Sequence, residues 1–171
     1  LGARFLNHQQ MPPGLFVVLQ GEVRLMSTLS SDRTVTIDRR GPGQMLGWIS
    51  ILRGESCELV QASEPTVALL IPASLLVEMW NSSSEFYSYF QRLSSPSEYA
   101  YVLEKLYRQF VAPPSDEEAW LKNAMLRTSL IPSPWDSNTI PPDSSLILST
   151  SLQKGSHNPV PVGTRLRCSE F

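Results

Sequence analysis

The feature that most constrains the fold is a two-residue alternation of apolar side chains around one glycine. Five apolar residues share one parity: Leu15, Val17, Leu19, Val23 and Leu25. Successive side chains of a strand point to opposite faces, so this spacing predicts two strands that are buried on one face. Gly21 lies between them, where a bend or a bulge is expected. The chain therefore begins with β structure.

Further strand signals follow at regular spacing. Residues 34–38 alternate again, and Gly41-Pro42-Gly43 is a strong turn signal. Residues 58–63 and 66–71 are two more strand candidates, separated by Glu64-Pro65. Short strands with turns between them are typical of a sandwich or barrel. We predict a β-roll over residues 1–82.

Helices are predicted after the strands. A short apolar run follows Pro72, and a capping box begins at Ser95 with Pro96 in the first helical position. An amphipathic stripe follows this box, at residues Tyr99, Val102, Leu103, Leu106 and Phe110. A second capping box begins at Ser115. We therefore predict a helical extension over residues 83–130, and the whole reads as mainly β with C-terminal helices.

The composition changes at Ile131. Residues 131–142 are rich in Pro, Ser, Asn and Asp, which is typical of a linker. Residues 145–151 and 160–167 are weaker strand candidates, and they form either a β-hairpin or the start of a next domain. Residue 1 is Leu, and residues 2–5 read like the interior of a domain. We expect the sequence to be a fragment of a longer protein.

Charge and composition argue against several classes of partner. The net charge is −2 and the only tight basic pair is Arg39-Arg40, which is too small for a nucleic-acid footprint. Apolar runs are far shorter than the ~18–20 residues of a membrane span, and no signal peptide is visible. Cys57 and Cys168 lack metal-ligand spacing. We predict two free thiols in a reducing compartment, no metal and no cofactor.

Residues 12–80 resemble the cyclic-nucleotide-binding domain, a double-stranded β-helix of jelly-roll type. Residues 13–25 resemble its strand–glycine–strand signature, and residues 41–52 resemble the glycine turn that leads into its phosphate-binding cassette. Residues 58–71 correspond to the two closing strands and residues 72–80 to the helix that packs on the roll. The resemblance implies this fold.

In this family the cassette surrounds the cyclic phosphate of the ligand. The resemblance implies that helix-end N–H groups and an arginine bind the phosphate and that a glutamate binds the ribose hydroxyl. Aligned by Gly47, the glutamate position falls on Trp48 and the arginine position on Cys57. Neither side chain can replace the original group, because Trp has no acceptor and a neutral thiol is a poor phosphate partner.

The loss of both contacts implies weak binding of cyclic nucleotides. Hydrogen bonds to charged groups contribute about 1.5–3 kcal/mol each, so losing two lowers the affinity about 10²–10⁴-fold. We interpret the cassette as a degenerate pocket, with these candidate residues: Gly47, Trp48, Ile49, Ser50, Arg53, Cys57 and Glu58.

Three of these candidates have alternative interpretations. Arg53 is either a displaced cation for an anionic ligand or a solvated loop residue. Trp48 either plugs the pocket or stacks on a different planar ligand. Glu58 is either a rearranged ribose contact or a solvent-facing strand residue.

Residues 40–63 are also similar to the N-terminal region of ABC exporters of the bacteriocin and toxin-secretion type, especially cyanobacterial ones. This similarity implies a non-catalytic, cytoplasmic regulatory domain that is joined to an inner-membrane transporter and senses a small anionic or nucleotide ligand or a partner. The fragment has no GxxxxGK[ST] run and therefore holds no ATPase itself. A ligand-free scaffold for homodimerisation or substrate docking is the first alternative.

Two further classes are less compatible with the residues. A cupin-like metalloenzyme needs a His/Glu cluster, whereas His8 and His157 lie at opposite ends of the chain. A Cys57 nucleophile has no His nearby in sequence. A transcription regulator of the same fold needs a helix-turn-helix, whereas Pro113-Pro114 interrupts the helices and no basic recognition face follows.

Overall fold

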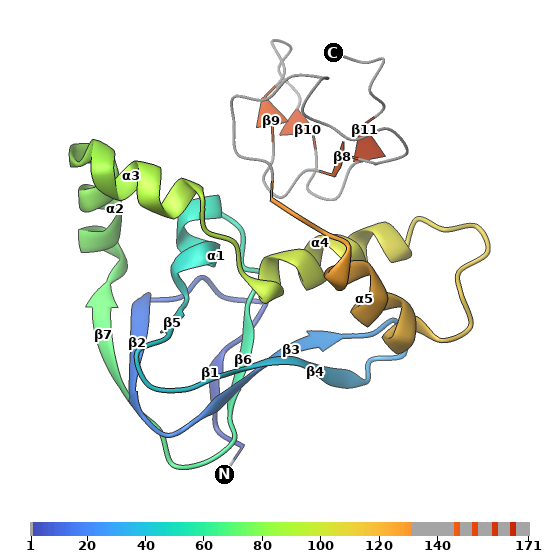
Figure 1. Ribbon diagram of the computed structural model, residues 1–171, viewed down its shortest axis with the longest axis horizontal. Coiled ribbons are helices and arrows are strands. Elements are labelled where there is room, and N and C mark those ends of the chain that lie inside the picture. The colour runs from blue at the N-terminus through green and yellow to red at the C-terminus, as the bar shows by residue number, and fades with distance from the viewer. Residues whose placement is uncertain (1, 131–145, 148–151, 154–158, 161–164, 167–171) are drawn as a thin grey trace.

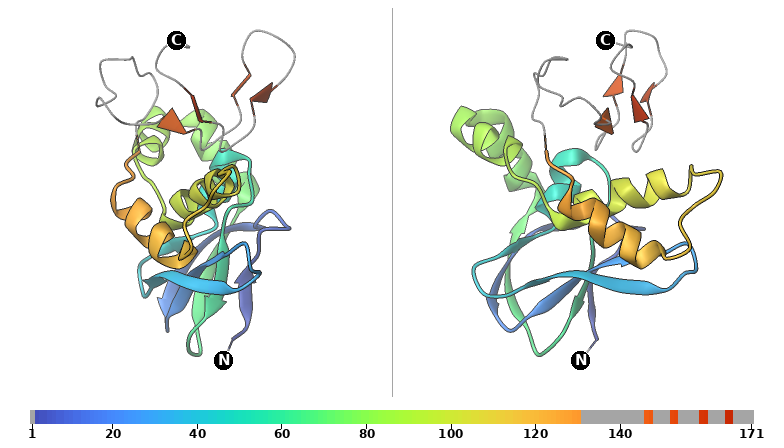
Figure 2. Two further views of the ribbon diagram at one scale, coloured as in Figure 1. Left: turned by 90° about the vertical axis from the view of Figure 1, so that its right-hand side faces the viewer. Right: turned by 45° about the vertical axis from the view of Figure 1, so that its right-hand side comes forward.

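The computed structural model describes residues 2–130 and four two-residue strands at 146–147, 152–153, 159–160 and 165–166. Residues 2–130 form two antiparallel sheets with helices gathered at one end (Figure 1). The turned views show the same arrangement, with the N-terminus at the end of the roll opposite the helices (Figure 2).

Seven strands build the roll. The four-stranded sheet has the order β1 (Arg4–Leu6), β6 (Leu59–Ala62), β3 (Val23–Thr28) and β4 (Thr34–Arg40). The three-stranded sheet has the order β5 (Met45–Leu46), β2 (Gly14–Gln20) and β7 (Val67–Pro72). Strands β2 and β3, and likewise β6 and β7, follow one another in sequence but lie in different sheets, whereas β3 and β4 pair in the same sheet. The predicted roll is confirmed, and β1 is an addition that the sequence pattern did not reveal.

The core between the two sheets follows the predicted face in β3 but not in β2, where Val18 is buried and Leu19 is 56% exposed beside a register shift. Six residues form its buried centre: Leu6, Val18, Val23, Leu25, Leu46 and Val60. Gly21 has a φ of 86°, and a Cβ there would lie 2.3 Å from the carbonyl oxygen of Pro65. Only glycine fits this position, because both the backbone conformation and the space exclude a side chain.

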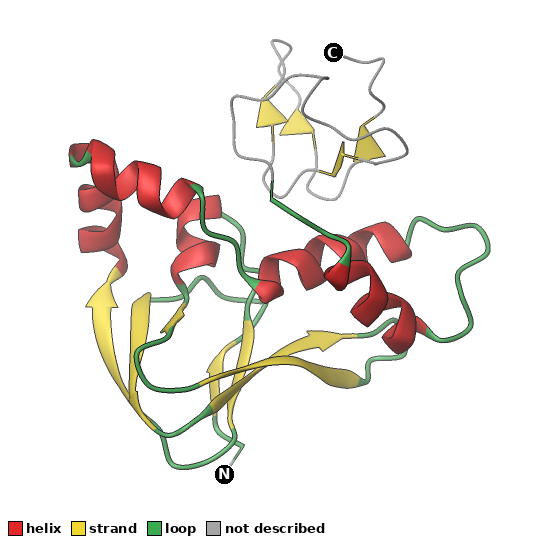
Figure 3. Cartoon of the chain, in the orientation of Figure 1, coloured by secondary structure: helices red, strands yellow, loops and turns green. Residues whose placement is uncertain are grey.

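Five helices follow or interrupt the strands (Figure 3). They are α1 (Trp48–Arg53), α2 (Ala73–Ser82), α3 (Ser84–Gln91), α4 (Pro96–Tyr107) and α5 (Glu117–Leu126). The Ser95 hydroxyl accepts a hydrogen bond from the Ser97 N–H, so α4 begins as predicted. The start of α5 lies one residue later than predicted, because Asp116 rather than Ser115 accepts the capping bond, from the Ala119 N–H.

Helices α4 and α5 pack on the four-stranded sheet through a small apolar cluster. Its buried residues are Leu29, Val35, Ala100, Leu103 and Leu121. The amphipathic stripe of α4 therefore serves packing. Polar contacts fix α5 to the β3–β4 loop, since Glu117 accepts hydrogen bonds from Ser30 and Glu118 pairs with Arg33 at 2.9 Å.

The described residues after 130 form two short antiparallel pairs. β8 (Leu146–Ile147) pairs with β11 (Arg165–Leu166), and β9 (Leu152–Gln153) pairs with β10 (Pro159–Val160). All four residue pairs fit one antiparallel register. The choice between a β-hairpin and the start of a next domain stays a prediction. The predicted linker at 131–142 and Cys168 lie outside the described residues.

Candidate functional site

The candidate cassette is the segment from Gly47 to Glu58 between β5 and β6. Gly47 has a φ of 83° and precedes α1, and Gly54 has a φ of 70° and follows it. A Cβ on Gly47 would lie 2.6 Å from the carbonyl oxygen of Gly14, so the cassette lies directly against β2. This close approach explains why a glycine stands at the start of α1, which has no side-chain cap of its own.

The Glu58 carboxylate occupies the N–H groups at the start of α1. One of its oxygens, Oε1, accepts a hydrogen bond of 2.8 Å from the Gly47 N–H. The other, Oε2, accepts one of 3.3 Å from the Ser50 N–H and one of 2.8 Å from the Ser50 hydroxyl. Glu58 is only 2% exposed. The interpretation of Glu58 as a solvent-facing residue is therefore wrong: its carboxylate caps α1 from inside the protein.

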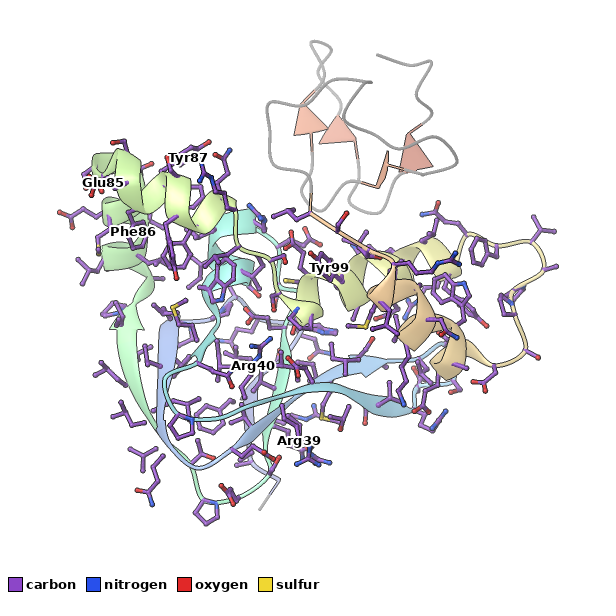
Figure 4. The ribbon with its side chains drawn as sticks, in the orientation of Figure 1. Arg39, Arg40, Glu85, Phe86, Tyr87 and Tyr99 are labelled. Atoms are coloured by element: carbon purple, nitrogen blue, oxygen red, sulfur yellow. The ribbon has the colours of Figure 1, made fainter. Side chains whose placement is uncertain are left out.

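Burial and hydrogen bonding act in opposite directions on Glu58. Burial raises the pKa of its carboxyl above the ordinary value. The donors of Gly47 and Ser50 and the charge of Arg40 oppose this shift of the pKa. Arg40 was not among the predicted site residues, although the adjacent basic residues Arg39 and Arg40 stand out in the sequence. Its side chain lies inside the roll and pairs with Asp38, whereas that of Arg39 points outward (Figure 4).

Trp48 is buried between the cassette and the helices. It is 5% exposed and belongs to a cluster with Leu15, Ile49 and Phe90. Its ring lies 5.2 Å from that of Phe90 in α3, at an angle of 64°, which is a favourable edge-to-face geometry. Trp48 thus has no exposed face on which a planar ligand could stack.

Arg53 is paired within the protein. Its guanidinium Nε donates to Glu98 Oε1 at 3.0 Å, and the two side chains are 12% and 3% exposed. The interpretation of Arg53 as a solvated loop residue is wrong, because it is the last residue of α1 and lies beneath α4. As the partner of a buried carboxylate it offers no free charge to an anionic ligand. The sequence could not reveal this pair, because 45 residues separate its members.

A second polar contact joins the cassette to α4. The Tyr101 hydroxyl donates to the Glu55 carboxylate, and Lys105 lies 3.4 Å from the same oxygen. Burial, and then the neighbouring Glu55, raise the pKa of Tyr101. The cassette is therefore held against α4 by two contacts that come from the end of α1 and the residues after it.

Ser50 and Cys57 complete the interior of the cassette. The Ser50 hydroxyl accepts a hydrogen bond of 3.2 Å from the Cys57 N–H and lies 3.6 Å from its Sγ atom. Burial, and then the charge of Glu58, raise the pKa of the Cys57 thiol to about 12. A neutral buried thiol is neither a phosphate ligand nor a nucleophile.

The structure thus brings the seven predicted residues together, but Gly47, Ser50, Cys57 and Glu58 direct their polar groups at one another and Arg53 pairs with Glu98. The two surface depressions described for residues 2–130 lie elsewhere, one between α2 and α3 and the other beside the β3–β4 loop. Within the described residues, no three His, Cys, Asp or Glu side chains are grouped to hold a metal ion. None of the described helices has the length and apolar character required to cross a bilayer.

Comparison with known proteins supports the fold. Residues 2–83 match the family model of the cyclic nucleotide-binding domain, and this part of the chain has that family's β-roll. No curated protein matches the sequence.

Two solved structures illustrate the similarity. One is a Crp/Fnr-family protein from Eubacterium rectale ATCC 33656, with a TM-score of 0.50 and 19% identity over 64% of this chain and 53% of the other. Another is a cyclic nucleotide-binding domain from Methylobacillus flagellatus KT, with a TM-score of 0.42 and 22% identity over 51% and 49%. At these identities the likeness concerns the fold alone, and the chain spans about half the length of either structure.

The residues of this cassette do not fit the cyclic phosphate that the family implies. The backbone donors at Gly47 and Ser50 already serve Glu58. The cations at or near the cassette are paired within the chain: Arg53 with Glu98, Lys105 with Glu55 and Arg40 with Asp38. A cyclic nucleotide would therefore have to displace a buried carboxylate without a compensating charge.

Proposed function

We propose that this chain is a regulatory or docking domain that does not depend on cyclic nucleotide. The single observation that supports the proposal is the Glu58 carboxylate, which accepts three hydrogen bonds from Gly47 and Ser50. An ionised carboxylate at this position repels a phosphate, because like charges in one site cost several kcal/mol. A protonated one still occupies the donors. In either state the cassette is closed to an anionic ligand.

Because the cassette is closed to an anionic ligand, we expect this domain to be regulated by contacts with other proteins. A ligand shifts a conformational equilibrium only through different affinities for two states, and this cassette offers a nucleotide nothing to bind. The domain would act in the cytoplasm as a non-catalytic part of a larger protein. Helix α4 would transmit its state, because Arg53 and Glu55 fix this helix to the cassette.

Two parent proteins are compatible with such a domain. The similarity of residues 40–63 favours an ABC exporter of peptides or toxins. The fold shared with the Crp/Fnr-family structure favours a transcription regulator. The sequence of the parent gene distinguishes them: membrane and ATPase segments downstream support the exporter, and a helix-turn-helix supports the regulator.

Isothermal titration with cAMP and cGMP tests the closed cassette. We expect no heat of binding in the micromolar range for the wild type, and a micromolar Kd would overturn the proposal. In Glu58→Ala the blocking carboxylate is absent, so we expect cAMP to bind at least about tenfold more tightly than to the wild type. Glu64→Ala is the matched control, since it removes an exposed carboxylate between β6 and β7 that does not contact α1's N–H groups, and it should bind no better than the wild type.

A further inference from the structure

Strand β7 forms an incomplete edge of the three-stranded sheet. It pairs with β2 on one side, and within the described residues no strand pairs with its other side. Strand β6 of the other sheet has a paired strand on both sides, whereas β7, which follows it in sequence, has a paired strand on one side only among the described residues. Free N–H and C=O groups along such an edge are a template for another strand.

The side chains of β7 show the same incompleteness. In a strand buried on one face, every second side chain should be covered. In β7 the exposed fractions are 54% for Val67, 51% for Leu69 and 45% for Leu70, so consecutive side chains on both faces remain in water. Figure 4 shows the side chains of β7 projecting from the outer edge of the roll.

The exposed apolar surface extends beyond β7, and we call it the apolar edge. It consists of six residues on β2, β7 and one flank of α2: Leu19, Val67, Leu69, Leu70, Leu75 and Met79. Each side chain presents on the order of 100 Å² of apolar surface when free, so six half-exposed ones leave roughly 300 Å² in water. Patches of about 300–600 Å² commonly mark interaction sites.

The charges around β7 favour a second copy of the chain as the occupant. No charged residue occurs between Glu64 and Glu78. Edge strands that avoid pairing commonly carry lysine or other charges, and β7 carries none. Two copies can therefore lie side by side without repulsion between like charges.

We infer that the apolar edge is a homodimer interface, in which β7 pairs antiparallel with β7 of a second copy about a two-fold axis. Such a pairing joins two three-stranded sheets into one six-stranded sheet. Pro65 and Pro72 lack N–H groups and bound the pairing segment. Covering the main chain of β7 together with the apolar edge brings the interface toward the ~800 Å² per partner of a stable complex. The inference stands independently of the closed cassette.

Light scattering and analytical ultracentrifugation of the full chain test the interface. We expect a dimer for the wild type. In Leu69→Lys two ammonium groups would face the same interface, so we expect dimerisation to weaken at least about 100-fold. Val67→Lys serves as a second variant, and circular dichroism verifies that each variant is folded. Val111→Lys is the matched control, because Val111 is fully exposed in the loop between α4 and α5, and it should remain a dimer.

Hydrogen exchange adds a local readout. In the dimer the edge-facing amides of β7 should exchange slowly, and they should exchange faster in Leu69→Lys, while β3 stays protected in both. A monomeric wild type with fast exchange in β7 would overturn the inference and leave this edge to another strand. A folded Leu69→Lys or Val67→Lys variant that remains dimeric, or a wild type that forms only mixed aggregates, would overturn it as well.

Discussion

The cassette and the apolar edge differ in how far the chain satisfies its own groups. In the cassette, the donors of Gly47 and Ser50 bind Glu58, and the charge of Arg53 binds Glu98. At the apolar edge, β7 has no strand on its outer side among the described residues, and its leucines are half exposed. The place where the family resemblance locates a ligand is thus the closed one. Recognition by this domain should occur where its structure is incomplete.

The largest effect on the cassette should follow from removing Arg53. In Arg53→Ala the Glu98 carboxylate remains buried without its cation, and breaking a buried pair in this way costs about 3–5 kcal/mol. Urea unfolding followed by circular dichroism measures this loss. The double variant Arg53→Met/Glu98→Leu should recover most of it, because both charges are then gone.

The exposed pair of Lys122 and Glu118 provides a control for this prediction. Their side chains are 56% and 28% exposed, so Lys122→Ala should cost less than about 1 kcal/mol. A loss for Arg53→Ala as small as that of the control would show that the cassette is not fixed to α4 by this pair. The cassette would then be no more strongly held by its own contacts than the apolar edge is.

A smaller effect should appear in the pH dependence of stability. The pKa of Glu58 is raised in the folded protein, so the folded state holds this proton more firmly than the unfolded state does. Its contribution to the free energy of unfolding is therefore greatest at low pH and declines as the pH rises above the ordinary value of 4.5. Glu58→Gln removes this contribution, so its stability should decline less steeply, by up to about 1.4 kcal/mol per pH unit.

Urea midpoints of the wild type and Glu58→Gln at a series of pH values measure the difference. The other carboxyls are common to both proteins and cancel. Parallel curves above pH 4.5 would contradict the raised pKa. They would mean that the hydrogen bonds from Gly47 and Ser50 and the charge of Arg40 fully offset the effect of burial on this carboxyl.

Local patterns predicted the roll, whereas the contacts that close the cassette join distant residues. Alternation around Gly21 and the cap at Ser95 act within a few residues. The two strands and the cap are confirmed, whereas the predicted buried face of β2 is wrong at Leu19, which is exposed. One interpretation of the sequence placed Glu58 in a strand with its side chain facing the solvent. It precedes β6, which begins at Leu59, so alternation does not govern it. Its donors lie at Gly47 and Ser50, and no local signal indicates that they converge on it.

Helix α3 shows a signal that was present but overlooked. Ser83 caps it by accepting a hydrogen bond from the Phe86 N–H. Phe86 and Phe90 have the i, i+4 spacing of a buried helical face, and their rings lie 4.5 Å apart. Exposed Tyr87 and Tyr89 lie on other faces of the same helix and obscure the stripe. Phe90 in turn covers Trp48. The burial of Trp48 therefore depends on a helix whose position within the predicted helical extension was not identified.

The smallest effect concerns Cys57, whose thiol should be inert. Burial raises its pKa to about 12, so the reactive thiolate is scarce at neutral pH. In a Cys168→Ser background, iodoacetamide at pH 8 should leave the folded protein unmodified and should label it once urea unfolds it; mass spectrometry measures the fraction labelled. Labelling of the folded protein at the rate of the unfolded chain would show that the cassette opens readily. The cassette and the apolar edge would then differ only in how often each is exposed to solvent. A cassette that opens far enough to expose Cys57 also frees the N–H groups that bind Glu58.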